Sequence, residues 1–156
     1  MPRRRPTAYA TVRAQLAAPW MVDPGHLEGI AAEVHREARL LDPFDVQSGE
    51  ALAMSIGCLV LRSPAAVCGA ACLLSGVLTV RPDRCDLVWN FNVLHEVAHR
   101  VIEPHEPHHS HADVWALTLA LAVPRGHLRR IEEARHVPAW ALRLRRQTSR
   151  AIPRAA

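Results

Sequence analysis

The sequence predicts an α+β fold, in which a mainly helical body carries a small, three-stranded, mostly antiparallel sheet. Apolar residues recur at helical spacing in the first and last parts of the chain, and short apolar runs bounded by Gly and Pro occupy the middle. With 156 residues, 49% of them hydrophobic, the chain can build one core. We expect one domain over residues 26–147, a loose arm over residues 1–25 and a tail over residues 148–156.

Two helices are predicted before the sheet. Asp23 is a good N-cap and Pro24 suits the first helical position, so a helix should run from there to about Leu41. The pair Asp42-Pro43 should end it, because a residue before proline avoids the helical conformation. A second helix is expected over residues 48–56, ending at Gly57.

The sheet is predicted from three short apolar segments, over residues 58–61, 66–74 and 76–80. The pair Ser75-Gly76 is typical of a hairpin turn and should make the last two strands antiparallel. Four cysteines, three of them in these segments and Cys85 after them, have no CxxC spacing, so we expect reduced thiols in the core rather than a zinc knuckle.

The second half of the chain is predicted to be helical. Apolar residues at positions i, i+3, i+4, i+7 and i+8 from Leu94 to Ile102 indicate an amphipathic helix that begins near Asp86 and ends before Pro104. A loop rich in His and Pro should follow over residues 103–110. Further helices are expected over residues 111–123, 124–135 and 137–147, the middle one polar.

Charge and hydropathy exclude some classes of protein. All 19 basic residues are Arg, and apart from clusters near the two ends they are scattered, so we expect no nucleic-acid surface despite the net charge of +4. No apolar run is long enough for a transmembrane helix, and Arg13 interrupts any signal-peptide core. A cytoplasmic protein without membrane contact is therefore expected.

Residues 95–99 read His-Glu-Val-Ala-His on the predicted amphipathic helix. Positions i and i+4 lie one turn apart on the same side, so His95 and His99 can reach one Zn²⁺ at about 2.0–2.1 Å. Glu96, which follows the first histidine, can take a proton from a water molecule that the metal activates. The motif predicts a zinc metallopeptidase with Glu96 as its catalytic base.

A catalytic zinc site needs a third protein ligand, and several residues downstream could supply it. His105 has the metzincin spacing, but that motif needs Gly where Ile102 continues the helical stripe. His111 begins the next helix, a rigid platform for a ligand, and is preferred. Asp113 and Glu106 stay open as alternatives. The remaining candidates in this tract, taken as solvated loop residues, are Glu103, His108 and His109.

At these residues the chain resembles the ImmA/IrrE family of metallopeptidases. Residues 91–99 read Phe-Asn-Val-Leu-His-Glu-Val-Ala-His, similar to the family's Phe-x-x-Ala-His-Glu-x-Gly-His, and the apolar helix that closes in Pro124 is similar to its Glu-x-x-Ala-Asn-x-Phe-Ala-x-x-Leu-Leu-Met-Pro. The resemblance covers about residues 26–147. Counting back from Pro124 places the family's third ligand, a Glu, on His111, so a three-histidine site is implied here. Trp115 stands where the family has Asn.

The resemblance implies a function as well as a fold. Family members typically act on a helix-turn-helix transcriptional repressor, often encoded beside them in mobile elements, and thereby derepress genes. We therefore expect a zinc-dependent endopeptidase with such a repressor as its partner. The alternative is a zinc-stabilised, non-catalytic module that sequesters a protein partner. His108, His109 and His127 are candidates for stabilising the oxyanion.

Overall fold

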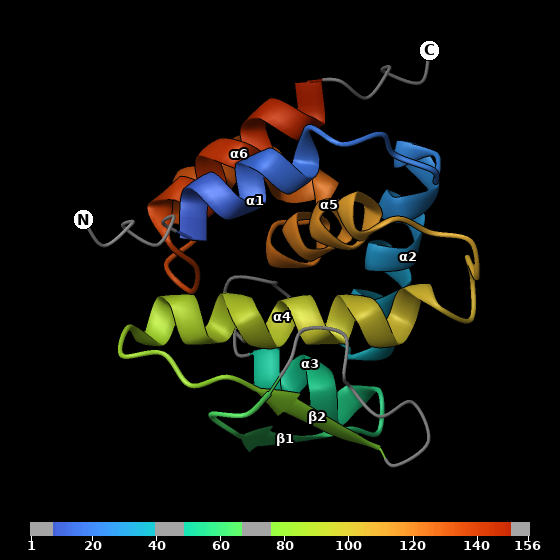
Figure 1. Cartoon of the computed structure of the whole chain (residues 1–156). Helices are drawn as coiled ribbons and strands as arrows, with labels where there is room; N and C mark the ends of the chain where they lie inside the picture. Colours follow the sequence, from blue (N-terminus) through green and yellow to red (C-terminus); the bar gives the residue numbers. More distant parts are fainter. Residues whose placement is uncertain (1–7, 40–48, 67–75, 151–156) are drawn as a thin grey trace.

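A computed structural model of the chain describes residues 8–39, 49–66 and 76–150 (Figure 1). It is mainly helical, and helix α4 runs through its middle. The two strands and α3 lie on one side of α4, and α1, α5 and α6 lie on the other. The elements are α1 (Ala8–Leu16), α2 (Pro24–Glu37), α3 (Gly49–Ser55), β1 (Leu59–Arg62), β2 (Val77–Val80), α4 (Asp86–Ile102), α5 (His111–Ala122), the 3₁₀ helix η1 (Arg125–Glu133) and α6 (Ala139–Arg150).

The sheet differs from the prediction. In the described residues it has two strands, which are parallel and pair from Leu59 with Val77 to Arg62 with Val80. The expected three-stranded, mostly antiparallel sheet was therefore wrong, and most of the predicted strand over residues 66–74 lies outside the described residues. Residues 63–76 connect the two strands and are long enough for the crossover that parallel strands require. An apolar run predicts a strand but carries no information on its direction.

Two glycines allow the strands to begin side by side. Gly57 and Gly76 have φ values of 78° and 63°, in the left-handed region that favours glycine. The carbonyl oxygen of Gly76 accepts a hydrogen bond of 2.8 Å from the amide of Leu59. A Cβ atom on Gly76 would lie 3.2 Å from the carbonyl oxygen of Gly57, so a side chain there would crowd the entry to both strands.

The N-terminal segment is more ordered than predicted. Residues 8–16, expected to lie in a loose arm, form helix α1, which packs on α5 and α6. Val12 is buried, and the ring of Tyr9 meets that of Trp140 edge to face at 6.4 Å. A helix this short is marginal by itself, so its stability comes from tertiary contacts that the weak periodicity did not reveal.

The helix boundaries agree with the local signals better than with the predicted lengths. The carboxylate of Asp23 accepts hydrogen bonds from the amides of Gly25 and His26 and caps α2, as expected. However, α2 ends at Glu37 rather than near Leu41, and Arg39 has a φ of 53°, which turns the chain away. The polar helix predicted after Pro124 is the 3₁₀ helix η1, which is interrupted at Arg130.

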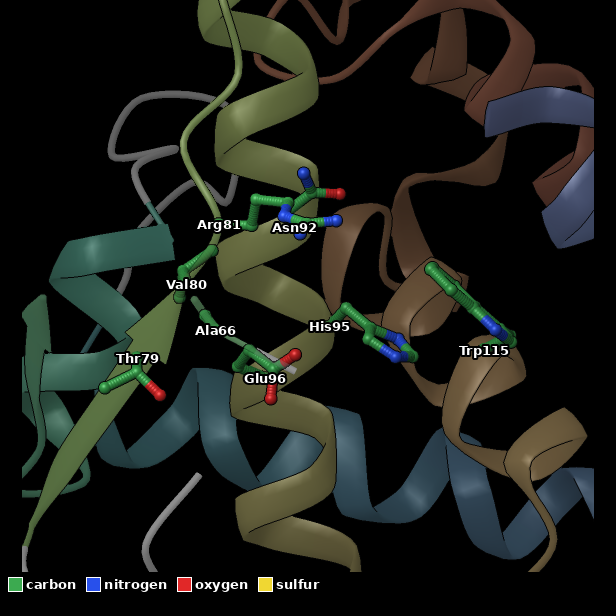
Figure 2. Close-up of a pocket in the computed structure, with 8 residues that line it drawn as sticks. All are labelled: Ala66, Thr79, Val80, Arg81, Asn92, His95, Glu96 and Trp115. Atoms are coloured by element: carbon green, nitrogen blue, oxygen red, sulfur yellow. The ribbon is translucent and has the colours of Figure 1, made fainter. Parts of the chain in front are cut away.

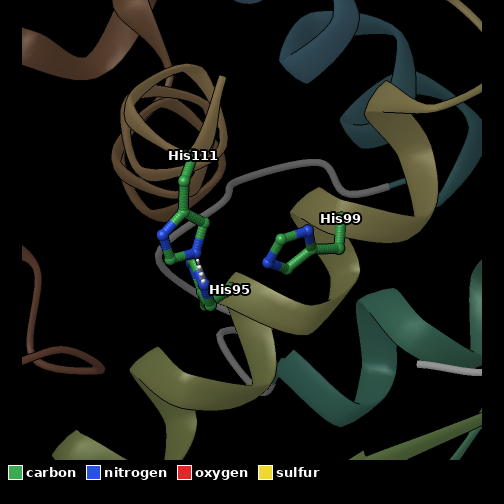
Figure 3. Close-up of side chains that lie close together, drawn as sticks. All are labelled: His95, His99 and His111. Carbon is green, nitrogen blue, oxygen red and sulfur yellow. Dashed lines mark hydrogen bonds between the residues drawn. The ribbon is translucent and has the colours of Figure 1, made fainter. Parts of the chain in front are cut away.

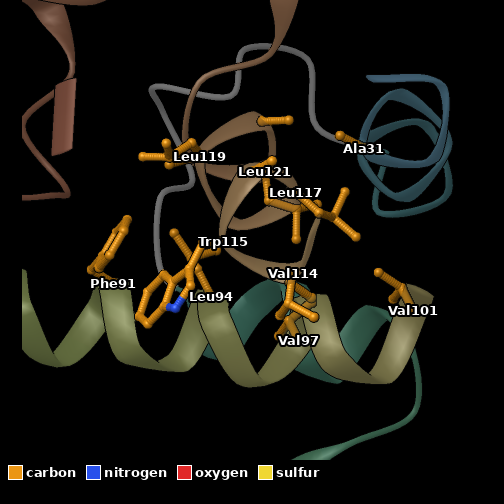
Figure 4. Packing of buried hydrophobic residues seen from close by; sticks show 14 of the residues in the cluster. Ala31, Phe91, Leu94, Val97, Val101, Val114, Trp115, Leu117, Leu119 and Leu121 are labelled. Carbon is orange, nitrogen blue, oxygen red and sulfur yellow. The ribbon is translucent and has the colours of Figure 1, made fainter. Parts of the chain in front are cut away.

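Helix α5 is the centre of the core. Every residue from Ala112 to Ala122 is buried, which is typical of a helix surrounded by other elements. Its contacts with α4 bring together side chains of both helices (Figure 4). The packed residues include Phe91, Leu94, Val97 and Val101 of α4 and Val114, Trp115, Leu117, Leu119 and Leu121 of α5. None of the helices formed by the described residues combines the length and apolar character needed to span a bilayer.

The C-terminal end of α5 is held by side chains. Carbonyl groups in the last turn of a helix have no partner within it. Here the carbonyl oxygens of Leu121, Ala122 and Val123 accept hydrogen bonds from His35 Nε2 (2.8 Å), His136 Nε2 (2.7 Å) and Arg145 Nε (2.8 Å). The guanidinium of Arg145 also pairs with the carboxylate of Glu28 on α2. These contacts fix the position of α5, whose opposite end carries His111.

The stability of the metal-free protein should depend on His35. Burial lowers the pKa of His35 below its ordinary value of 6.5, although its hydrogen bond to Leu121 opposes the shift. The unfolded chain therefore binds a proton more readily than the folded protein. The stabilisation is complete above pH 6.5 and decreases as the pH falls from 6.5 through the lower folded-state pKa. It should change by at most about 1.4 kcal/mol per pH unit.

Urea unfolding at a series of pH values would measure this dependence. The advantage of the wild type over His35→Gln, whose amide can replace Nε2 as donor, should shrink as the pH falls below 6.5. Removing the charge of His35 also relieves the lowering of the pKa of His136, which adds to the difference in the same pH range. His105→Gln is the control, since His105 is exposed, and its curve should parallel that of the wild type. A constant difference between wild type and His35→Gln would contradict the assignment.

Candidate metal centre

Helix α4 presents the predicted motif toward the interior. The helix spans 17 residues and its side chains contact α5, α3 and β2. His95 and Glu96 are buried, with 3% and 5% of their surface exposed, and His99 lies one turn further along. The prediction that residues 95–99 are helical is confirmed, and the apolar stripe beside them packs on α5 as expected.

His111 completes a cluster of three histidines. It is the first residue of α5 and points toward His95 and His99 from across the gap between the two helices (Figure 3). One ring nitrogen from each histidine lies within 4.8 Å of the other two, and the Nε2 atoms of His95 and His111 are 3.1 Å apart. Two nitrogen ligands of a tetrahedral zinc ion lie about 3.4 Å apart, so the group could hold a metal ion after a small adjustment.

A hydroxyl group determines which nitrogen of His95 faces the cluster. His95 Nδ1 lies 3.1 Å from Thr118 Oγ1, and that hydroxyl lies 2.7 Å from the carbonyl oxygen of Val114. A carbonyl can only accept, so the hydroxyl donates to Val114 and accepts from Nδ1. The proton of a neutral His95 is thus on Nδ1, which leaves the lone pair of Nε2 available to a metal ion.

An indole ring supports the same histidine. Trp115 stacks on His95 with ring centroids 3.6 Å apart and an angle of 19° between the planes, and Phe91 stacks on Trp115 at 5.8 Å. The side chains of Trp115 and Thr118 follow His111 by one and two turns on the same side of α5. Helix α5 therefore supplies a ligand at its start and two contacts that hold the imidazole of His95.

The pKa values of His95, His99 and His111 are all lowered, which favours their neutral forms. Burial lowers the pKa of His95 well below its ordinary value, and the charges of His99 and His111 lower it further. Burial, followed by the charges of His111 and His109, lowers the pKa of His99 to about 4. The pKa of His111 is lowered by burial and then by His109. Because metal ligation requires an unprotonated nitrogen, protons compete weakly for this site at neutral pH.

Asp113, one of the alternative ligands, has a structural role. It is fully buried, and its carboxylate accepts hydrogen bonds from the amide and hydroxyl of Ser110 at 2.7 and 2.8 Å. It also accepts from the amides of Met21 and Val22 in the segment before α2. The carboxylate therefore completes the capping box of α5 and joins the N-terminal segment to the turn that carries His111.

His105 also lies outside the cluster. Ile102 is fully buried and keeps α4 helical where a metzincin chain would turn back to the metal. The exposed His105 follows the helix and lines a different pocket, with Ile30 of α2. In Glu106, the other alternative, Oε1 lies 3.3 Å from Nε2 of His26, and this residue is not part of the three-histidine group.

The three candidates for stabilising the oxyanion, His108, His109 and His127, lie at different distances from the histidine cluster. His109 is close enough to His99 and His111 for its charge to lower the pKa of both. Its Nδ1 donates a hydrogen bond of 2.7 Å to the carbonyl oxygen of Glu106. His108 is exposed on the same loop, and His127 lies on η1, where its charge acts on His35. Of these three candidates, His109 is the one placed beside the histidine cluster.

A pocket adjoins the cluster on the side of Glu96 (Figure 2). Its walls come from the end of β2, from α4 and from α5. The residues that line it are Ala66, Thr79, Val80, Arg81, Asn92, His95, Glu96 and Trp115. Arg81, Asn92 and Thr118 were not predicted as site residues, because they lie outside the His-Glu-Val-Ala-His segment over residues 95–99. For Thr118 a signal existed, since it follows the preferred ligand His111 by two helical turns.

Comparisons with protein-family models, curated proteins and solved structures found no match for this chain.

Thr118 should tune the affinity for metal. Thr118→Val keeps the shape but removes the hydroxyl that orients His95, so zinc affinity should fall about 10–100-fold. Competition with a chromophoric chelator would measure it. Thr118→Ser retains the hydroxyl and should bind zinc nearly as well as the wild type. If valine and serine variants bound equally, packing rather than the hydrogen bond would hold the ring.

Proposed function

We propose that this protein is a zinc-dependent peptidase that cuts a protein substrate in the pocket beside Glu96. One observation carries the proposal. Three histidine nitrogens within 4.8 Å of one another lie next to a buried carboxyl group that lines an open pocket. Three groups that could bind a metal ion, a carboxyl group that could act as a general base and space for a substrate thus lie together, which supports hydrolysis at a metal.

The donor set favours zinc. Imidazole nitrogen is a preferred ligand of Zn²⁺, and catalytic zinc sites commonly combine three protein ligands with one position for water or substrate. His95, His99 and His111 would be those ligands, each as a neutral ring. When bound there, zinc would polarise the scissile carbonyl and lower the pKa of the attacking water.

Glu96 would move the protons of the reaction. It is next to the proposed ligand His95 in the sequence and lines the pocket (Figure 2), and it is not part of the three-histidine group. From there it would accept a proton as the water oxygen attacks the carbonyl carbon. It would then deliver that proton to the amine nitrogen as the peptide bond breaks. Burial of Glu96 limits access of bulk water to this transfer.

The substrate is proposed from the resemblance to the ImmA/IrrE family. It points to a helix-turn-helix repressor, whose cleavage would derepress genes, and the absence of a predicted nucleic-acid surface is consistent with action on the repressor rather than on DNA. The pocket runs between the end of β2 and α4 and would receive an extended segment of the repressor chain.

The proposal is tested by sequencing the genes beside this one and purifying a helix-turn-helix protein found there. Zinc-loaded protein should cut that repressor at one or a few sites and leave casein largely intact, and Glu96→Gln should cut neither. Mass spectrometry of the products would identify the cleaved bond. Rapid digestion of casein with an intact, unbound repressor would contradict a regulatory role. Stoichiometric binding of the repressor without cleavage would favour a sequestering module instead.

A further inference from the structure

We infer that Arg81 and Asn92 form a subsite for a carboxylate group of the substrate, beside Glu96. The inference rests on the proposed peptidase function and concerns its specificity. A carboxylate can come from an acidic side chain or from the C-terminus of a peptide, and both have the same recognition chemistry. The peptidase should therefore prefer substrates that place a negative charge at this end of the pocket.

The backbone at Arg81 is held in place by the core. Arg81 directly follows Val80, the last residue of β2, which is 3% exposed and packs with Trp89 and Val93 of α4. The Arg81 side chain leaves the strand on the pocket side and extends toward α4 (Figure 2). An anchored backbone with a charged side chain at the pocket wall is suited to recognise a substrate group.

The two terminal nitrogens of the Arg81 guanidinium are available to donate hydrogen bonds. Its Nε donates a hydrogen bond of 3.3 Å to the carbonyl oxygen of Pro64, which steadies the side chain. Within the described part of the chain, the guanidinium of Arg81 makes no further hydrogen bond and no ion pair with a carboxylate. The planar fork of a guanidinium matches the two oxygens of a carboxylate. The two terminal nitrogens of Arg81 could therefore bind a substrate carboxylate.

Asn92 supplies a neutral donor at the same wall. It precedes Glu96 by four residues on α4, so the two side chains lie one turn apart on the same face. Both line the pocket, and Asn92 is half-buried. Its amide group can donate to a bound carboxylate without adding charge. Together, Arg81 and Asn92 offer N–H donors from two different elements.

Arg81 and the proposed metal centre would attract an anion to the pocket. Besides the proposed metal ligand His95, the titratable side chains among the described residues that line it are Arg81 and Glu96. The three proposed metal ligands are neutral, so they would not offset the charge of a divalent ion, unlike a set with a carboxylate ligand. A substrate carboxylate would thus be attracted by Arg81 and by the proposed metal centre, and among the described residues that line the pocket Glu96 would oppose it.

Peptide binding tests the subsite independently of cleavage. The probes are short acetylated peptide amides that carry one Glu, placed in turn at each position, and matched peptides with Gln. Binding to the zinc-loaded Glu96→Gln protein is measured by calorimetry. At one position the Glu peptide should bind about 10-fold more tightly than its Gln counterpart, the order expected for a charge-assisted pair. Adding Arg81→Gln should remove this preference, and Arg81→Lys should retain part of it.

Two controls distinguish a specific effect of Arg81 from a general charge effect, and a side-chain carboxylate from a terminal one. Arg84→Gln removes the same charge from an exposed position three residues away and should keep the preference. A Gln peptide with a free C-terminus, compared with its amide, shows whether a terminal carboxylate uses the subsite. Equal affinity for Glu and Gln peptides, or no binding of either, would overturn the inference. Selective binding together with no cleavage by the wild type would support the subsite and contradict the peptidase.

Discussion

Replacement of His111 by alanine should weaken zinc binding more than about 100-fold, because losing a hydrogen-bonding partner of a ligand alone costs about 10–100-fold. His111 Nε2 lies 3.1 Å from His95 Nε2, and its ring nitrogen belongs to the three-histidine group. His105→Ala should leave the affinity close to that of the wild type. Metal analysis and chelator competition would measure both variants, and His95→Ala and His99→Ala should also lose stoichiometric zinc.

The comparison of His111 with His105 is decisive because both side chains are accessible at the surface of the metal-free protein. Neither substitution removes a large buried side chain, so both variants should fold, which circular dichroism would verify. If His105→Ala lost zinc and His111→Ala kept it, the site would have the metzincin arrangement, and α4 would have to bend at Ile102. Retained stoichiometric zinc in both His95→Ala and His99→Ala would contradict the whole cluster.

Replacement of Glu96 by glutamine should abolish most of the proposed activity and preserve the metal. Glutamine has the same shape but cannot accept the proton of the attacking water, and a general base typically contributes about 10²–10⁴-fold to the rate. The turnover number for the repressor or a derived peptide should fall by that factor. Zinc content should stay at the wild-type level, because Glu96 is not part of the ligand group.

A surface carboxylate provides the matched control for this experiment. Glu33→Gln makes the same chemical change on α2, where Glu33 pairs with Arg36 outside the pocket beside Glu96, and should keep full activity. Cleavage by Glu96→Gln at the wild-type rate would contradict the proposed base. Loss of zinc from Glu96→Gln would instead assign the carboxylate a part in holding the metal.

The candidate site depends on helix α5 more than on any other element outside the motif. His111 starts α5, Thr118 orients His95, and Trp115 stacks on the same ring. The helix is in turn anchored at both ends, by Asp113 at its start and by donors such as His35 at its C-terminal carbonyls. A rigid α5 should thus keep the third ligand in register with α4 even without metal.

Local patterns in the sequence determined the main helix of the site. The apolar stripe and the histidines at i and i+4 depend only on helical geometry, so the side of α4 that carries His95 and His99 followed from spacing alone. The capping of α2 by Asp23 was predictable for the same reason, since a cap involves residues next to each other in the chain. Interactions between residues at most a few positions apart can be predicted from the local sequence.

Contacts between distant segments required the tertiary structure. Spacing left His105, His111 and Asp113 open as ligands, and only the packing of α5 on α4 brought His111 to the cluster and placed Asp113 against Met21. The parallel direction of β2 and the position of Arg81 at the pocket are likewise decided by how segments meet. Helical periodicity states which face of a segment is buried, whereas the partner of that face depends on the whole chain.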